Sequence, residues 1–93
     1  MKTKKCLHAL FSGTVQGIGF RYTAERLARQ FSVAGYVKNL PDGRVELVAE
    51  GDGAEIEAFF KAVRESSLSH YIREVKAEWQ ETAGRYKMFE IAY

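Results

Sequence analysis

A chain of 93 residues with a hydrophobic fraction of 46% can form one domain around its own core, without disulfides or a structural metal. The formal net charge of +2 excludes the strongly basic surface typical of a general nucleic-acid-binding protein. The single cysteine, Cys6, excludes an internal disulfide and a cysteine-based zinc site, and it favours a reducing compartment. No apolar run of signal-peptide or membrane-spanning length follows the basic N-terminus, so we expect a cytoplasmic protein with no membrane partner.

The spacing of apolar residues predicts strands and helices along the whole chain. Strands are expected over residues 5–13, 35–40, 44–50, 71–80 and 86–92, and helices over residues 21–33 and 54–66. Gly35 is a stop signal for the first helix, and Pro41-Asp42-Gly43 is typical of a tight turn between the second and third strands. Asp52 is expected to cap the second helix.

This order of elements is β-α-β-β-α-β with an additional terminal strand, the pattern of a ferredoxin-like α+β sandwich. We therefore predict a single domain over residues 1–93, in which an antiparallel sheet carries two helices on one face. The first two strands should be parallel to each other, joined by a right-handed crossover, with the third strand between them. Their carboxyl ends then lie at the same edge of the sheet.

The segment from Gly13 to Arg21 joins the first strand to the first helix and contains three glycines within seven residues. Glycine lets the backbone bend so that several N–H groups point at one place, and a helix N-terminus adds positive charge there. Arg21 adds a planar, permanently charged group suited to phosphate oxygens. The segment lacks the Gly-Lys-Ser/Thr of a P-loop and the spacing of a dinucleotide fingerprint. An ordinary strand-to-helix turn with a solvated arginine is the alternative.

Asn39 stands at the end of the second predicted strand. A helix over 21–33 advances about 18 Å at about 1.5 Å per residue, and the following strand returns about 16 Å at about 3.3 Å per residue. The chain therefore comes back to the level of Arg21, so loop N–H groups, a guanidinium and a carboxamide should meet at one edge. The alternative for Asn39 is a residue that caps the adjacent turn.

Two stretches of the chain resemble the signatures of the acylphosphatase family. Gly13–Arg21 is similar to G-x-V-Q-G-V-x-F-R, and the second signature is matched by Gly35-Tyr36-Val37-Lys38-Asn39, then Gly43-Arg44-Val45 and Gly51. Ile18 stands where valine is usual, and Thr14 stands where a basic residue is common. Neither departure removes a catalytic group, and the resemblance covers nearly the whole chain.

The resemblance implies a small monomeric hydrolase that cleaves acyl phosphates to a carboxylate and inorganic phosphate, without a metal ion or other cofactor. Asn39 would orient the attacking water. The implied substrates are acetyl phosphate, carbamoyl phosphate, 1,3-bisphosphoglycerate and aspartyl phosphates, and inorganic phosphate or sulfate is expected to occupy the site. Carried over by motif position, the phosphate-binding residues are Arg21 and, through their backbone N–H groups, Val15, Gln16, Gly17, Ile18, Gly19 and Phe20.

This reaction needs no catalytic acid. The leaving carboxylate has a conjugate acid with a pKa of about 4, so it departs without a proton. Phosphoryl transfer through a loose transition state depends mainly on positioning and on charge stabilisation. The sequence identifies no protein base for the proton of the water.

Three other functions fit the same architecture. An RNA-recognition domain would carry aromatic residues on its third strand, but residues 44–50 read Arg-Val-Glu-Leu-Val-Ala-Glu. A non-catalytic anion-binding or regulatory domain would need the glycine segment but not Asn39. The acylphosphatase-like domain of larger carbamoyl-transfer maturation proteins would be accompanied by zinc-finger cysteines, and we expect a free-standing domain here.

Overall fold

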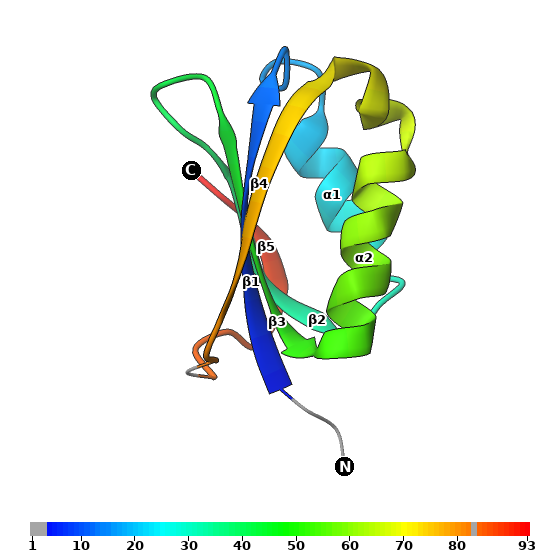
Figure 1. Ribbon diagram of the computed structural model, residues 1–93, viewed down its shortest axis with the longest axis vertical. Helices are drawn as coiled ribbons and strands as arrows, with labels where there is room; N and C mark the ends of the chain where they lie inside the picture. The colour runs from blue at the N-terminus through cyan, green and yellow to red at the C-terminus, as the bar shows by residue number, and fades with distance from the viewer. Residues whose placement is uncertain (1–3, 83) are drawn as a thin grey trace.

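The computed structural model describes residues 4–82 and 84–93, in which a five-stranded sheet carries two helices on one face (Figure 1). The strands are β1 (Lys4–Gly13), β2 (Val33–Asn39), β3 (Val45–Asp52), β4 (Ile72–Gln80) and β5 (Phe89–Ala92). The helices are α1 (Phe20–Ala28) and α2 (Gly53–Glu65), and a 3₁₀ helix (Ser67–Tyr71) connects α2 to β4.

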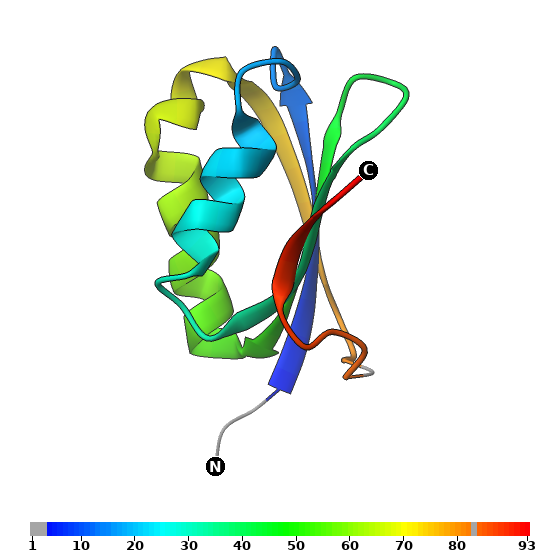
Figure 2. The same ribbon diagram turned by 180° about the vertical axis from the view of Figure 1, so that it is seen from behind.

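The strand order is β4-β1-β3-β2-β5, which confirms the predicted ferredoxin-like α+β fold. Strand β3 is antiparallel to both β1 and β2, so the last two are parallel to each other with β3 between them. The expectation of a wholly antiparallel sheet needs correction at one edge, because β5 pairs in parallel with β2 (Figure 2). Strand β4 ends beside the start of β1, so the chain enters β5 from the end of the sheet at which β2 also begins.

Helix α1 is shorter than predicted, since it ends at Ala28. The N–H groups of Arg29, Gln30 and Phe31 donate to carbonyls three residues back, at 3.3, 3.0 and 3.1 Å, and this tight turn ends the helix. Phe31 then turns toward α2, with its ring 6.0 Å from that of Phe59. Phe31 therefore fits the apolar spacing of a longer helix, but it packs against α2 from the turn that follows α1.

The core lies between the helices and the sheet and contains the two aromatic residues nearest to the glycine segment. Phe11 of β1 and Phe20 of α1 are both buried, with ring centroids 4.9 Å apart. Phe60 of α2 lies against the other side of Phe11, at 6.0 Å. Because Phe20 precedes Arg21 directly, this packing fixes the first turn of α1 relative to the end of β1.

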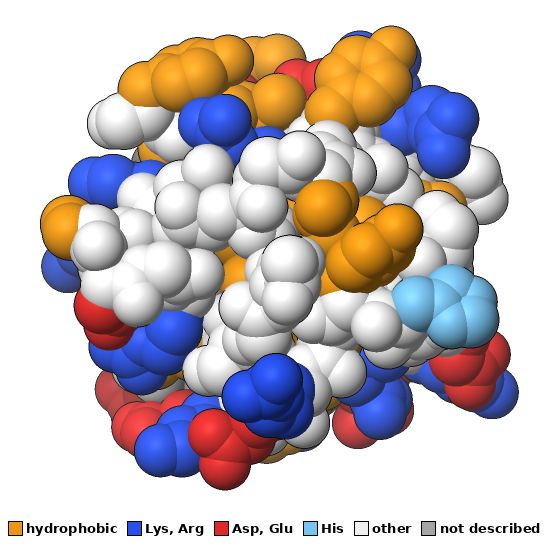
Figure 3. All heavy atoms as spheres, turned by 90° about the horizontal axis from the view of Figure 1, so that it is seen from above, with side chains coloured by type: hydrophobic (Ala, Val, Ile, Leu, Met, Phe, Trp, Pro, Cys, Tyr) orange, Lys and Arg blue, Asp and Glu red, His pale blue; other side chains and the backbone are white. Residues whose placement is uncertain are grey.

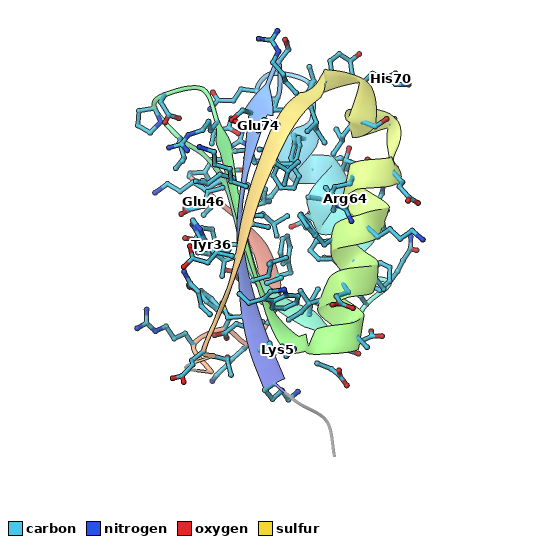
Figure 4. The ribbon with its side chains drawn as sticks, viewed as in Figure 1. Lys5, Tyr36, Glu46, Arg64, His70 and Glu74 are labelled. Carbon is cyan, nitrogen blue, oxygen red and sulfur yellow. The ribbon has the colours of Figure 1, made fainter. Side chains whose placement is uncertain are left out.

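A hydrogen-bonded group ties the three central strands together on the face of the sheet away from the helices. The Tyr36 hydroxyl of β2 donates to Glu46 of β3 at 3.0 Å, and His8 Nε2 of β1 lies 2.8 Å from the other oxygen of Glu46. Figure 4 shows Tyr36 and Glu46 projecting from this face. Burial, and then the bond to Glu46, raise the pKa of Tyr36 to about 12.

The connection between β4 and β5 is held across the sheet by Glu50, the one charged residue that is buried in the described part of the chain. Its carboxylate accepts the Thr82 hydroxyl at 2.8 Å and the Tyr86 N–H at 3.3 Å. Glu50 is covered because the connection crosses the open face of the sheet.

The raised pKa of Tyr36 predicts a loss of stability at alkaline pH. The unfolded chain releases a tyrosine proton near pH 10 and the folded chain only near pH 12, so stability is complete below about 10 and falls as the pH rises toward about 12. Tyr36→Phe should lower the free energy of unfolding by about 1 kcal/mol at neutral pH and flatten this decline. Urea unfolding from about pH 9 to about pH 12 measures both, with Tyr22→Phe as the control at an exposed tyrosine. Equal slopes for Tyr36→Phe and wild type would contradict the prediction.

Candidate anion-binding site at the ends of β1 and β2

The ends of β1 and β2 and the start of α1 lie at the same end of the molecule, the upper end in Figure 1. Here the glycine segment, Arg21 and Asn39 border one cavity of about 230 Å³, so the structure brings together the groups that the sequence predicted to meet. We call this cavity the loop cavity. Its lining residues are Val15, Gly17, Gly19, Phe20, Arg21, Tyr22, Asn39, Ile91 and Tyr93.

The glycine segment has the backbone conformation of an anion-binding loop. Gly17 and Gly19 have φ values of +80° and +79°, and Ile18 between them has a negative φ. Alternation of this kind turns successive N–H groups toward one side of the backbone. A Cβ at Gly17 or Gly19 would meet no atom within 4 Å, so glycine is required here for the backbone angle and not for space.

Within the described part of the chain, no side chain caps the N-terminus of α1. Its N-cap is Gly19, which makes no side-chain hydrogen bond, and its first turn contains no acidic residue. The N-terminus of α2 differs, because Asp52 accepts the Ala54 N–H at 3.0 Å and Glu55 lies in the first turn. The positive end of the α1 dipole is therefore not neutralised by side chains and borders the loop cavity.

Among the residues that the structure describes, Arg21 is the only one with a charged side chain that lines the loop cavity. Within residues 4–82 and 84–93 it forms no ion pair. The ring of Tyr93 lies 5.1 Å from its guanidinium carbon, a distance typical of a cation–π contact. Such a contact uses a face of the guanidinium and leaves the N–H groups at its edge available for an anion.

Figure 3 views the molecule from this end, and backbone and uncharged polar atoms occupy much of the middle of the face. Basic side chains lie around them, and acidic side chains are found toward the margins. The charge distribution on this face therefore suits a small anion that contacts the backbone.

Two of the residues predicted to bind phosphate do not line the loop cavity. The Ile18 side chain packs against the hydrophobic core. The Gln16 side chain turns away from the cavity, and its Nε2 donates to the carbonyls of Leu40 and Arg44, at 2.7 and 2.9 Å. These two side chains shape the loop, whereas the cavity wall within the segment consists of the other predicted residues, Val15, Gly17, Gly19, Phe20 and Arg21.

Three residues of the loop cavity were missed as site residues from the sequence: Tyr22, Ile91 and Tyr93. The last two reach the cavity because β5 pairs with β2 in parallel, with Val37 opposite Ile91. The pairing ends with Lys38 opposite Ala92, and the next residues of the two segments, Asn39 and Tyr93, lie beside each other at the cavity. The assumption of an antiparallel sheet concealed this relation, and no local pattern in the sequence indicates it.

A larger cavity of about 430 Å³ lies at the β4–β5 connection, where Lys4, Lys87 and Glu50 are among its lining residues. Its described lining residues include neither an uncapped helix N-terminus like that of α1 nor an arginine. The buried carboxylate of Glu50 would repel an anion. The loop cavity is smaller, but its lining suits an anion better than the lining of this larger cavity does.

Among residues 4–82 and 84–93, no three His, Cys, Asp or Glu side chains are grouped closely enough to hold a metal ion. In the same part of the chain, no helix has the length and apolar character needed to cross a lipid bilayer.

Comparison with known proteins gives matches over nearly the whole chain. The family model described as acylphosphatase matches residues 7–91. An acylphosphatase of Archaeoglobus fulgidus is 42% identical over 87 residues, which cover 94% of this chain and 97% of that protein. The crystal structure of an acylphosphatase from Bacillus subtilis aligns with a TM-score of 0.87 at 32% identity and covers 96% of this chain and 99% of that one.

The same fold also occurs as part of a longer protein. The crystal structure of full-length HypF in its phosphate- and nucleotide-bound form aligns with a TM-score of 0.89 at 29% identity. That match covers 100% of this chain but only 12% of HypF, in contrast to the near-complete match with the relative from A. fulgidus.

Two glycine substitutions separate anion binding from backbone strain. Gly17 and Gly43 both have positive φ and open space where a methyl group would be added, so Gly17→Ala and Gly43→Ala should each destabilise the fold by about 1 kcal/mol. Only Gly17→Ala should weaken binding of inorganic phosphate, by about tenfold, because only Gly17 borders the loop cavity. Thermal unfolding and an NMR titration with phosphate measure the two effects. Equal loss of phosphate affinity in both variants would exclude a specific role for the loop.

Proposed function

The chain belongs to the acylphosphatase family of enzymes, and from this we propose that its loop cavity hydrolyses acyl phosphates to a carboxylate and inorganic phosphate. The observation that carries the proposal is the presence, in one cavity, of a glycine-rich backbone loop, an arginine and a carboxamide. The loop and the arginine suit the phosphoryl group, and the carboxamide suits a water molecule.

We propose that the transferred phosphoryl group lies in the curve of the glycine segment. The backbone N–H groups of residues 15–20 and the first turn of α1 donate to its oxygens, and Arg21 adds two parallel N–H groups. Charge on these oxygens is redistributed as the bond to the acyl group breaks. Donors that are already oriented stabilise that charge without reorganising, which is the largest contribution that such a site makes to the rate.

In this proposal Asn39 orients the attacking water. Its carboxamide oxygen accepts a hydrogen bond from the water, so an oxygen lone pair of the water is directed at phosphorus. A bond forms between the water oxygen and phosphorus, the bond between phosphorus and the acyl oxygen breaks, and the carboxylate leaves with that electron pair. A phosphate oxygen takes the proton of the water, because no lining residue of the loop cavity is a carboxylate, histidine or lysine.

The composition of the loop cavity suits this leaving group. A carboxylate with a conjugate-acid pKa of about 4 leaves without protonation, so no general acid is required. Arg21 and the backbone N–H groups provide the positive charge that many phosphoryl-transfer enzymes take from a metal ion, and we propose a metal-independent reaction. We also propose that the protein is active as a monomer.

The walls beyond the phosphate-binding groups are apolar. Tyr22, which is 64% exposed, and Ile91 and Tyr93 contribute this part of the lining. Since Arg21 is engaged by the phosphoryl group, no further cation remains in the lining to attract a charged acyl group. The site therefore suits acyl phosphates with an uncharged acyl group, such as acetyl or benzoyl phosphate.

A non-catalytic anion-binding domain is the second candidate, since it would use the same loop and arginine. Asn39 distinguishes the two functions. A protein that only binds phosphate has no need of a carboxamide next to the anion, whereas a hydrolase needs a group that positions water.

Asn39→Ala should lower kcat by about 10²- to 10³-fold, the effect of removing one preorganised polar group. Binding of inorganic phosphate should remain close to that of wild type, because the loop and Arg21 are unchanged. The measurement is phosphate release from benzoyl phosphate in the presence of EDTA, together with a phosphate titration. Lys38→Ala is the matched control, since neighbouring strand residues point to opposite faces. Equal rates in wild type and Asn39→Ala would favour the binding function.

Arg21→Lys should lower both phosphate affinity and kcat, each by about tenfold or more, because lysine keeps the charge but loses the fork of parallel donors. Arg26→Lys, in the last turn of the same helix, is the control for the same change at an exposed position. Steady-state kinetics and isothermal titration with phosphate give the two quantities. Near-normal turnover in Arg21→Lys would rule out the two-pronged contact with the phosphoryl group.

A further inference from the structure

The Gln16 side chain links the glycine segment to the turn between β2 and β3, residues 40–44. One amide nitrogen, Nε2, donates to the Leu40 carbonyl at 2.7 Å and to the Arg44 carbonyl at 2.9 Å. These acceptors lie 24 and 28 residues further along the chain, so the contact is not part of any local turn. Both N–H groups of the amide are thereby used.

The turn does not need Gln16 in order to close. The Leu40 N–H donates to the Arg44 carbonyl at 2.8 Å, and the Gly43 N–H donates to the Leu40 carbonyl at 3.1 Å. The Asp42 carboxylate also accepts the N–H and the Nε of Arg44, at 3.0 and 2.8 Å. Each carbonyl that Gln16 contacts therefore keeps a backbone donor of its own if the Gln16 amide is removed. What the Gln16 bonds add is the attachment of the turn to the loop.

The two parts that Gln16 attaches to each other carry different halves of the proposed chemistry. On the loop side, its chain neighbours Val15 and Gly17 both line the loop cavity. On the turn side, Leu40 directly follows Asn39, which lines the cavity as well. The Gln16 side chain is turned away from the cavity, so any effect of its amide on the reaction passes through the segments that it holds.

We propose that Gln16 is a positioning residue that holds Asn39 at the correct distance from the phosphate-binding loop. This inference rests on the proposed hydrolysis of acyl phosphates. The loop follows β1, whereas Asn39 is the last residue of β2, where it pairs with Val45, and the turn that Gln16 holds begins directly after it. A displacement of about 1 Å between a water and the atom it attacks costs about 10²-fold in rate. The amide of Gln16 restrains that displacement.

Gln16→Met tests the proposal because it removes both donors at nearly the same side-chain volume. We expect kcat for benzoyl phosphate to fall by about tenfold to 10²-fold, while the Kd for inorganic phosphate changes by less than about twofold. The circular dichroism spectrum should remain that of the wild type. A parallel loss of kcat and phosphate affinity would overturn the proposal, because it would show that Gln16 maintains the loop itself.

Asp42→Ala is the matched control. It removes two contacts of Asp42 with Arg44 within the same turn but leaves the bonds of Gln16 intact. We expect kcat within about twofold of wild type. If Asp42→Ala lowers kcat as much as Gln16→Met does, general loosening of the turn explains the result and the proposal fails.

Gln16→Glu gives a test within a single variant that does not depend on the folding of Gln16→Met. An ionised carboxylate has no donor and faces two carbonyl oxygens, whereas a protonated carboxyl group has one O–H that can bond to one of them. The kcat of Gln16→Glu should therefore rise relative to wild type as the pH is lowered through the titration of this carboxyl group. A constant ratio of Gln16→Glu to wild type across that range would overturn the proposal.

The two proposals fail in different ways. If the wild-type protein binds phosphate but does not hydrolyse benzoyl phosphate, the proposed function is wrong, and the positioning role falls with it. If the wild type is active and Asn39→Ala is impaired, but Gln16→Met retains the wild-type kcat, only the role of Gln16 is wrong.

Discussion

The rest of the site depends on the anchoring of both ends of a short loop in the hydrophobic core. Val15 and Phe20 are buried, whereas Gly17 and Gly19 between them are exposed. Phe20 packs on Phe11, so the first turn of α1 cannot move relative to the end of β1 without opening the core. Packing at both ends thus holds the flexible glycine backbone of the loop in one of the several conformations that glycine allows.

An anion site built in this way carries uncompensated positive charge before any ligand arrives. The N-terminus of α2 shows the alternative arrangement, in which Asp52 and Glu55 neutralise the dipole. Helix α1 has neither group, and Arg21 in its first turn adds to the charge. Under the proposed function, a phosphoryl group bound there would offset this local excess of charge. The proposed phosphate-binding groups lie close together in the sequence, whereas the placement of Asn39 depends on contacts between more distant segments.

Much of this could be predicted from the sequence, because the relevant signals are local. Alternating and helical spacings located the strands and helices, and the glycines with Arg21 indicated an anion loop. Helical and strand lengths were enough to bring Asn39 to the same edge. The missing information is long-range. Neither the parallel pairing that brings Tyr93 beside Asn39 nor the bonds of Gln16 to residues 24 and 28 positions away follow from any local pattern. The burial of Glu50 likewise depends on a connection that crosses the sheet.

The short strand β5 contributes a wall of the loop cavity but none of the groups proposed to bind the phosphoryl group or the water. It comprises only Phe89–Ala92 and pairs with β2 alone among the described strands, yet Ile91 and the adjacent Tyr93 form a wall of the loop cavity. The groups assigned to bond breaking all precede residue 40. Under the proposed function, we expect substitutions of Ile91 to change the preferred acyl group more than they change the rate of bond breaking.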